Sequence, residues 1–192
     1  MGDIVSEKKK EIIRAAAELI HTKGYEPTKL SDIMKASDIG KGQFYHYFSS
    51  KRELGLTIVD YYAEMWDREL IQGIFQSSFS AEKKMENMLE WAVNYHVGTQ
   101  GLSGCPFGNL AIEMSEHDEE FRLKINHLID QWIYHLAHVM EDLRGKDQAL
   151  QQARVIVAQI EGGILLMKSY QDISILKDVI EAIRLNYLNE GE

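Results

Sequence analysis

Cys105, the single cysteine of the chain, carries the most reactive side chain in the sequence and stands in the run Gly104-Cys105-Pro106. Because proline fits the first position of a helix, this run predicts a thiol at a helix N-terminus. The helix dipole favours a thiolate there, and the thiolate is the form that reacts with electrophiles and oxidants. The alternative is a buried cysteine that packs as a small apolar side chain. With no second cysteine, oxidation could not form a disulfide within the chain.

Imidazole and carboxylate groups could also perform chemistry, as ligands of a metal ion. The chain has 7 His, and two groupings have spacings that a metal site could use: His135 and His138 with His127 further back, and Glu113, Glu116 and His117. Helical spacing shows only that a pair can converge, and chance pairs are expected among this many histidines. We therefore expect no functional metal ion and no cofactor.

A third group of side chains, between residues 28 and 51, suits contacts with nucleic acid. The apolar residues of this stretch can close a small core: Leu30, Ile33, Ile39, Phe44 and Phe48. Gln43, Tyr45 and His46 then face outward on the second of two short helices joined by a tight turn, the layout that puts a helix into the major groove of DNA. Lys41, Tyr45 and Lys51 could contact phosphates, and Gln43 could contact a base edge. The alternative is a helical hairpin whose aromatic side chains merely pack.

The charge distribution agrees with a nucleic-acid-facing N-terminal part. The net charge of −9 argues by itself against a nucleic-acid binder. Residues 1–53, however, carry 10 Lys+Arg against 8 Asp+Glu, a net +2, while the remainder carries 11 against 22, a net −11. Such asymmetry indicates a nucleic-acid-facing segment followed by an acidic, solvated one.

The elements that must position these groups are helices, and the predicted fold class is all-α. Apolar residues recur at helical spacing in nearly every segment, as at Ile13, Ala16, Ala17 and Ile20 in the first one. Gly98, Gly101, Gly104, Pro106 and Gly108 predict a loop or a broken helix over 98–108. The predicted helices span about 6–23, 29–36, 40–47, 50–71, 80–96, 118–143, 147–170 and 173–188.

Two local patterns refine these helices. Ser50-Lys51-Arg52-Glu53 is a capping box, in which the Ser hydroxyl and the Glu carboxylate satisfy each other's backbone amides at a helix start. The last two helices carry apolar residues in alternating steps of four and three, which suits helix-against-helix packing. Such a seam can join two chains or form the core of one chain. Its residues are Ala149, Ala153, Ile156, Ile160, Gly163 and Met167, then Ile173, Leu176, Ile180, Ile183 and Tyr187.

Composition bounds the class of protein. The 192 residues are 45% hydrophobic and 27% charged, which is typical of a globular chain with its own core. No apolar run approaches the roughly 20 residues that span a bilayer. The N-terminal residues lack the apolar core of a signal peptide, and one cysteine fits a reducing compartment. We therefore expect a cytoplasmic protein with no membrane partner.

The stretch around residue 45 resembles the DNA-binding domain of the tetracycline-repressor (TetR) family of bacterial transcription regulators. The match is strongest in Lys41-Gly42-Gln43-Phe44-Tyr45-His46-Tyr47-Phe48, followed by Ser50-Lys51 and Leu54, and it covers residues 6–55 closely. Asp38 departs from the glycine usual in the turn, but Asp tolerates a left-handed φ. Gly40 replaces the usual serine N-cap of the recognition helix. The resemblance implies a helix-turn-helix domain over 1–52 and a ligand-binding and dimerisation domain over 53–192.

The resemblance also implies partners and site residues. It implies a homodimer that binds a near-palindromic operator, in which Gln43 and His46 read bases while Thr28, Lys41, Tyr45 and Lys51 contact the DNA backbone. The middle helices would enclose a small-molecule effector, and aromatic and Met side chains there, with few Arg and Lys, suit a largely apolar one. Some members of the family respond to electrophiles through a cysteine in this region, which makes an electrophilic effector the alternative. The candidate lining is Met88, Trp91, Tyr95, His96, Cys105, Phe107, Asn109, Leu128, Trp132 and His135. The last two helices would form the dimer interface through Ile156, Ile160, Gly163, Met167, Leu176, Ile180 and Ile183.

The sequence is compatible with three functions. The first is a ligand-released transcription repressor. The second is an enzyme with Cys105 as nucleophile and a histidine as base, but the sequence lacks a dinucleotide-binding glycine motif, a P-loop and a Gly-x-Ser-x-Gly nucleophile motif. The third is a helical interaction protein whose hairpin never meets DNA. We expect the first, and therefore no enzymatic activity.

Overall fold

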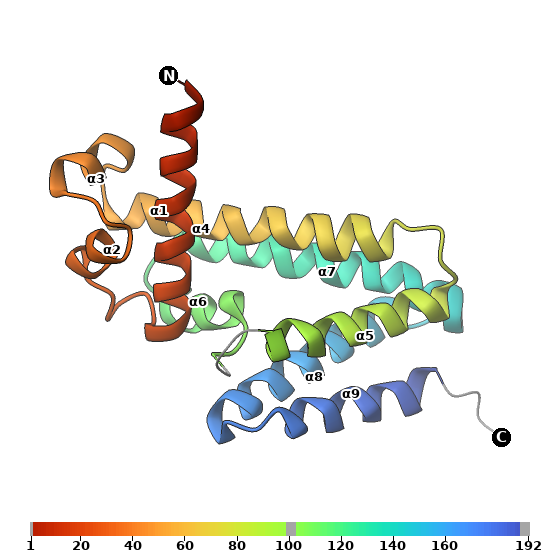
Figure 1. Ribbon diagram of the computed structural model, residues 1–192. Helices are drawn as coiled ribbons and strands as arrows, with labels where there is room; N and C mark the ends of the chain where they lie inside the picture. Colours follow the sequence, from red (N-terminus) through yellow and green to blue (C-terminus); the bar gives the residue numbers. More distant parts are fainter. Residues whose placement is uncertain (1, 99–102, 189–192) are drawn as a thin grey trace. The chain divides into compact units, whose positions relative to one another are not determined.

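The computed structural model describes residues 2–98 and 103–188, and this part of the chain is all-α, as predicted (Figure 1). None of the described helices is long and apolar enough to cross a membrane. The elements are α1 (Gly2–Lys23), α2 (Leu30–Ala36), α3 (Lys41–Tyr47), α4 (Lys51–Trp66), η1 (Asp67–Phe75), α5 (Ala81–Gly98), α6 (Pro106–Met114), α7 (Glu119–Arg144), α8 (Ala149–Tyr170) and α9 (Ile173–Tyr187).

The chain folds into two compact units that interleave along the sequence. The first unit comprises Met1–Glu64 and Pro106–Ile125, and the second comprises Met65–Cys105 and Asn126–Glu192. The first unit therefore extends beyond residue 52, where the sequence predicts its boundary. It takes in most of α4, all of α6 and the first turns of α7.

The core of the first unit forms between α1 and the α2–α3 hairpin. On α1 the buried side chains are Ile12, Ala16, Ala17 and Ile20, so Ile12 replaces the predicted Ile13, which is half-buried. In the hairpin Ile33, Phe44 and Phe48 are buried as predicted, whereas Leu30 and Ile39 are half-buried. The buried face of each short helix is thereby fixed, and so is the face left to solvent.

The turn between α2 and α3 forms in spite of its unusual residues. Asp38 adopts a left-handed φ of 50°, as expected for the residue that replaces glycine here. Gly40 is the N-cap of α3 and offers no side-chain hydrogen bond. A Cβ added at Gly40 or Gly42 would meet nothing within 4 Å, so the first turn of α3 is open to an approaching molecule.

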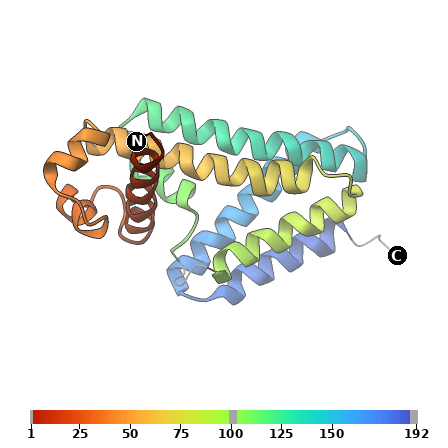
Figure 2. The same cartoon turned by 45° about the horizontal axis from the view of Figure 1, so that its top comes forward.

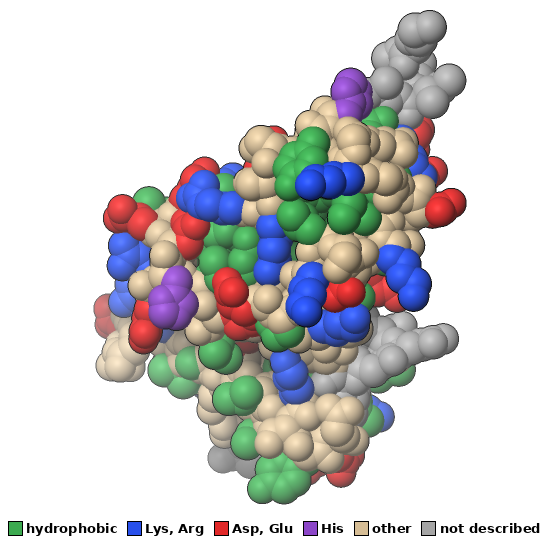
Figure 3. Space-filling view, turned by 90° about the vertical axis from the view of Figure 1, so that its left-hand side faces the viewer, with side chains coloured by type: hydrophobic (Ala, Val, Ile, Leu, Met, Phe, Trp, Pro, Cys, Tyr) green, Lys and Arg blue, Asp and Glu red, His purple; other side chains and the backbone are tan. Residues whose placement is uncertain are grey.

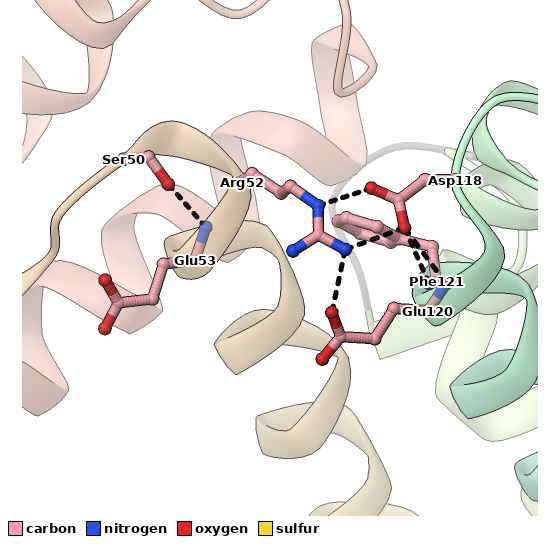
Figure 4. A network of polar contacts seen from close by, with 6 residues as sticks. All are labelled: Ser50, Arg52, Glu53, Asp118, Glu120 and Phe121. Atoms are coloured by element: carbon pink, nitrogen blue, oxygen red, sulfur yellow. Dashed lines mark hydrogen bonds and ion pairs between the residues drawn. The ribbon is translucent and has the colours of Figure 1, made fainter.

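The predicted capping box at the start of α4 forms only in part (Figure 4). Glu53 N donates to Ser50 Oγ at 3.1 Å, as predicted. The Glu53 carboxylate, however, accepts from Ser49 N at 2.7 Å and from Ser49 Oγ at 2.6 Å, one residue earlier than the motif requires. Both bonds lower the pKa of Glu53. The helix start is therefore capped, but with a shifted pairing.

The helix predicted over 50–71 changes its geometry at Trp66. It continues as a π-helix through Phe75, in which residues five apart face each other. Gln72 Nε2 accordingly donates to Asp67 Oδ2 at 2.5 Å. Gly73 fits the same register, because a Cβ there would lie 3.2 Å from the Arg68 carbonyl oxygen.

The segment over 98–108 contains the start of α6, and residues 99–102 lie outside the described part. Pro106 is the first residue of α6, which agrees with the predicted helix N-terminus after Cys105. The sequence analysis did not predict that this helix continues to Met114. Four buried side chains hold it in place: Pro106, Phe107, Leu110 and Met114.

In the second unit α8 packs against α9, and α5 also lies along α9 (Figures 1 and 2). The apolar seam of α8 and α9 is the core of this packing. A Cβ at Gly163 would lie 3.2 Å from Val179 and 3.3 Å from Leu176, both on α9. The interface role predicted for the seam is thus wrong, because the residues named for it are already buried inside one chain: Ile156, Ile160, Gly163, Met167, Leu176, Ile180 and Ile183.

Candidate functional site

The outward face of α3 is the site that the sequence predicts for DNA contacts. Lys41, Gln43 and His46 are exposed, and Tyr45 is 48% exposed. The Tyr45 ring meets the edge of the buried Phe44 ring at 5.4 Å, which anchors it without covering it. The side of the molecule that carries α2 and α3 shows Lys and Arg side chains among apolar and acidic ones (Figure 3). This face offers amide, phenol, imidazole and ammonium groups to a ligand.

Lys51 lies beside the turn that joins α1 to α2. Its Nζ donates to the Glu26 carbonyl oxygen at 3.3 Å and lies 4.3 Å from the centre of the Tyr25 ring. The side chain is half-buried in this position. Its charge remains at the first turn of α4, close to where the sequence places it.

Thr28 does not occupy the predicted role. Its side chain is fully buried, and its Oγ1 donates to the Gly24 carbonyl oxygen at 2.6 Å. A hydroxyl that is buried and already hydrogen-bonded cannot reach a phosphate. Thr28 instead stabilises the turn between α1 and α2, which corrects the sequence prediction for this residue.

The predicted effector residues divide between the two units. Phe107 and Asn109 belong to α6 in the first unit, where the Phe107 ring packs edge-on against Tyr62 at 5.9 Å. The others lie in the second unit: Met88, Trp91, Tyr95, His96, Cys105, Leu128, Trp132 and His135. Met88, His96, Cys105 and Trp132 are buried, whereas Trp91, Tyr95, Leu128 and His135 are half-buried.

Within the second unit, Trp66 joins several of these residues into one aromatic cluster. Its ring meets the edges of Trp91 at 5.3 Å and Trp132 at 5.4 Å, and Trp91 contacts Tyr95 at 5.8 Å. Trp132 Nε1 donates to Met88 Sδ at 3.3 Å. Trp66 was not among the predicted effector residues, although steps of four from Leu54 through Ile58 and Tyr62 lead to it.

His135 packs against another aromatic ring in this region. Its ring stacks on Phe75 with centroids 6.1 Å apart. Burial lowers the pKa of His135, and the nearby His138 lowers it further. In residues 2–98 and 103–188 no three His, Cys, Asp or Glu side chains converge to hold a metal ion.

Cys105 contacts a carboxyl group that the sequence analysis did not connect with it. The thiol is buried and donates a hydrogen bond to Glu161 of α8. Burial raises the pKa of Glu161, and the bond from the thiol lowers it by a smaller amount. The contact places a proton acceptor beside the Cys105 thiol within the second unit.

A groove between α5 and α9 is separate from the aromatic cluster. It has a volume of about 610 Å³, and none of the predicted effector residues lines it. Its walls carry mixed charges, since Arg184 is paired with Glu86 at 2.6 Å and with Glu181 at 2.5 Å. The lining residues are Leu89, Glu90, Val93, Asn94, Lys177, Asp178, Ile180, Glu181 and Arg184.

Comparison with known proteins identifies the class of this chain. Residues 12–57 match the family described as bacterial regulatory proteins of the tetR family. Residues 81–182 match the C-terminal domain of LmrA/YxaF-like transcriptional regulators. The chain belongs to the TetR family of transcriptional regulators. It is a DNA-binding regulator and not an enzyme, so the role of catalytic nucleophile considered for Cys105 is excluded.

Individual relatives agree with this assignment along the whole chain. An HTH-type transcriptional regulator in the lacX 3' region of Lactococcus lactis subsp. lactis is 36% identical, with 96% of this chain and 95% of that protein covered. The HTH-type transcriptional repressor NemR of Escherichia coli (strain K12) is 21% identical, with 92% of each covered. A TetR transcriptional regulator from Chloroflexus aurantiacus has a similar structure, with a TM-score of 0.85, 26% identity and 96% of each chain covered.

Membership of the TetR family relates the α3 face to DNA binding. Members bind operator DNA and small-molecule effectors as dimers. α3 thus belongs to the helix-turn-helix domain that the family match covers, which favours DNA binding over a hairpin that merely packs. The residues that line an effector site, and the compound that binds there, depend on the side chains of this chain.

The raised pKa of Glu161 predicts a pH-dependent effect on stability. The folded chain holds the Glu161 proton at a pH where the unfolded chain has already lost it, so stability falls as pH rises above about 4.5. Glu161→Gln keeps an oxygen acceptor for the Cys105 thiol and removes the titration. We expect the melting temperature of Glu161→Gln to exceed that of the wild type more at pH 8 than at pH 5. An equal difference at both pH values would contradict the burial of a titrating carboxyl.

Proposed function

We propose that this TetR-family regulator is a cytoplasmic homodimeric repressor released from its operator by a small, largely apolar or electrophilic effector. The observation that carries the proposal is the α3 face, whose polar side chains are exposed over a buried Phe44–Phe48 core. The name of NemR supports the repressor role, since that relative is called a repressor.

For operator binding we propose that some side chains of the α3 face contact bases and others contact phosphates. Gln43 and His46 contact base edges, because an amide and an imidazole both offer hydrogen-bond donors and acceptors in the major groove. Lys41, Tyr45 and Lys51 contact phosphates. In a dimer the two α3 helices enter successive major grooves, about 34–36 Å apart.

For the dimer we propose the outer face of α8, defined here as Val155, Ala158, Gly162, Leu165 and Ser169. These residues recur in steps of three and four and face away from the buried seam. Val155 is 44% exposed and Leu165 is 54% exposed, so this face offers apolar surface to a partner. A Cβ at Gly162 would meet nothing within 4 Å, so this position leaves room for a second copy of α8.

For the effector we propose the aromatic cluster of the second unit. Its rings, the Met88 thioether and the His135 ring stacked on Phe75 suit a ligand with aromatic or apolar surface. The electrophilic alternative is favoured by one contact, the bond from Cys105 to Glu161. When a soft electrophile forms a bond to the sulfur, the thiol proton can pass to this carboxylate.

Substitutions on α3 should separate base reading from phosphate contact. Gln43→Ala should relax sequence preference by roughly 1–3 kcal/mol if its contact is bidentate. Lys41→Ala should weaken binding to all duplexes and reduce the slope of log K against log salt by about 1. Lys177→Ala is the control, because it removes an exposed charge from α9. Equal salt slopes for Lys41→Ala and Lys177→Ala would remove Lys41 from the interface.

Neighbouring glycines of α8 provide a matched test of the dimer. Gly162→Leu adds its side chain to open space on the outer face, so we expect a folded monomer in sedimentation equilibrium. Gly163→Leu adds the same side chain against Val179 and Leu176, so we expect a loss of unfolding free energy of about 1–3 kcal/mol. A Gly162→Leu protein that stays dimeric at micromolar concentration would exclude the outer face of α8.

The effector proposal is tested by operator release with two kinds of compound. We expect a planar apolar compound to release wild type and Cys105→Ser equally. We expect an α,β-unsaturated carbonyl to release only the wild type if the thiol is the sensor. Fluorescence anisotropy of labelled duplex measures both. If neither protein is released by the electrophile and the mass spectrum shows Cys105 unmodified, Cys105 is a packing residue and not a sensor.

A further inference from the structure

The turn between α1 and α2, Gly24–Thr28, is held by a side chain from a distant helix. Gly24 adopts a φ of +94° as α1 ends, and its N–H donates to the Ile20 carbonyl oxygen at 2.8 Å. The next two amides have no partner within the turn. Tyr25 N donates to Glu113 Oε1 at 3.2 Å, and Glu26 N donates to Glu113 Oε2 at 3.0 Å. Both oxygens of one α6 carboxylate therefore bind this turn.

The contact between Glu113 and the turn requires a carboxylate at position 113 and glycine at position 24. A carboxylate accepts backbone hydrogen bonds more strongly than a neutral group does. The left-handed φ and the close approach both require glycine at position 24, since a Cβ there would lie 3.0 Å from Glu113 Oε1. A shorter or neutral side chain at position 113 could not satisfy both amides in the same way.

The same turn contacts α4 and α7. The Tyr25 ring meets the Phe121 ring at 5.4 Å, edge-on. Gly55 of α4 makes room for both rings, because a Cβ there would lie 2.6 Å from Tyr25 and 2.7 Å from Phe121. Lys51 covers the other side of the Tyr25 ring. Movement of the turn would therefore displace a residue of the DNA-binding face.

A second contact joins the same distant segment to the other end of the α2–α3 hairpin (Figure 4). Arg52 donates to both Asp118 oxygens, through Nε at 2.5 Å and Nη2 at 3.0 Å, and to Glu120 at 2.7 Å. Asp118 also accepts from Glu120 N and Phe121 N in the first turn of α7. Arg52 is half exposed, so its ion pairs stabilise the first unit only modestly.

We infer that Glu113 is a positioning residue for operator binding, which holds the start of the α2–α3 hairpin while Asp118 holds its end through Arg52. Residues 106–125 thus fix both ends of the DNA-reading hairpin within the first unit. Glu113 touches no DNA in this account; it acts through the turn that precedes α2. The inference rests on operator binding as proposed above.

The experiment compares Glu113→Gln and Glu113→Ala with the wild type as full-length dimers. Lys124→Gln is the control, because it removes another ion pair between α7 and α4, with Asp60, away from the turn. The probes are a duplex that the wild type selects from a randomised library and an unrelated duplex of equal length. Hydrogen exchange of the Tyr25 and Glu26 amides reports whether the contact is lost.

We expect Glu113→Ala to bind the selected duplex about tenfold more weakly, Glu113→Gln to fall between it and the wild type, and Lys124→Gln to match the wild type. Binding to the unrelated duplex and the salt slope should stay unchanged, because no phosphate contact is removed. Unchanged binding of the selected duplex, despite faster exchange at both amides, would overturn the inference. So would equal weakening on both duplexes with a lower melting temperature. A wild type that selects no duplex would instead refute operator binding itself.

Discussion

The first unit depends on the turn between α1 and α2, where the chain must leave one helix and set the direction of the DNA-reading hairpin. Gly24 supplies the left-handed backbone, and Thr28 closes the turn with its buried hydroxyl. The two amides that follow the end of α1 are satisfied by Glu113 of α6. Because these two bonds join the turn to α6, the orientation of α2 is tied to a helix 88 residues further along the chain.

Local patterns in the sequence predicted the hairpin well but could not predict what holds it. The apolar spacing placed Phe44 and Phe48 inside and Tyr45 outside, and Asp38 adopts the predicted left-handed turn. Thr28 was wrongly expected at the DNA because its hydroxyl pairs with the Gly24 carbonyl oxygen, a contact that depends on the turn having formed. The contacts of Glu113 with the turn and of Glu161 with Cys105 could not be predicted for the same reason, since their partners are distant in sequence.

The seam of α8 and α9 shows a different limit of sequence patterns. A repeat of threes and fours indicates that two helices pack, but it does not say whether they belong to one chain or two. Gly163 faces α9 of its own chain, while Gly162 faces open space one residue away. The interface proposed for the dimer therefore lies on the side of α8 that the seam leaves exposed. In the same way, members of the family bind small-molecule effectors, and the proposal that the cluster of Trp66, Trp91 and Trp132 holds the effector rests on this chain's own aromatic contacts.

The central claim is that the exposed face of α3 reads a specific DNA sequence as part of a dimer. The most direct measurement is the affinity of the wild-type protein for its selected duplex and for a scrambled duplex across a range of salt concentrations. The account predicts two protomers per selected duplex, an affinity ratio of at least about 10³, and log K that falls linearly with log salt on both duplexes. Equal affinity for the two duplexes, or binding that does not respond to salt, would contradict it.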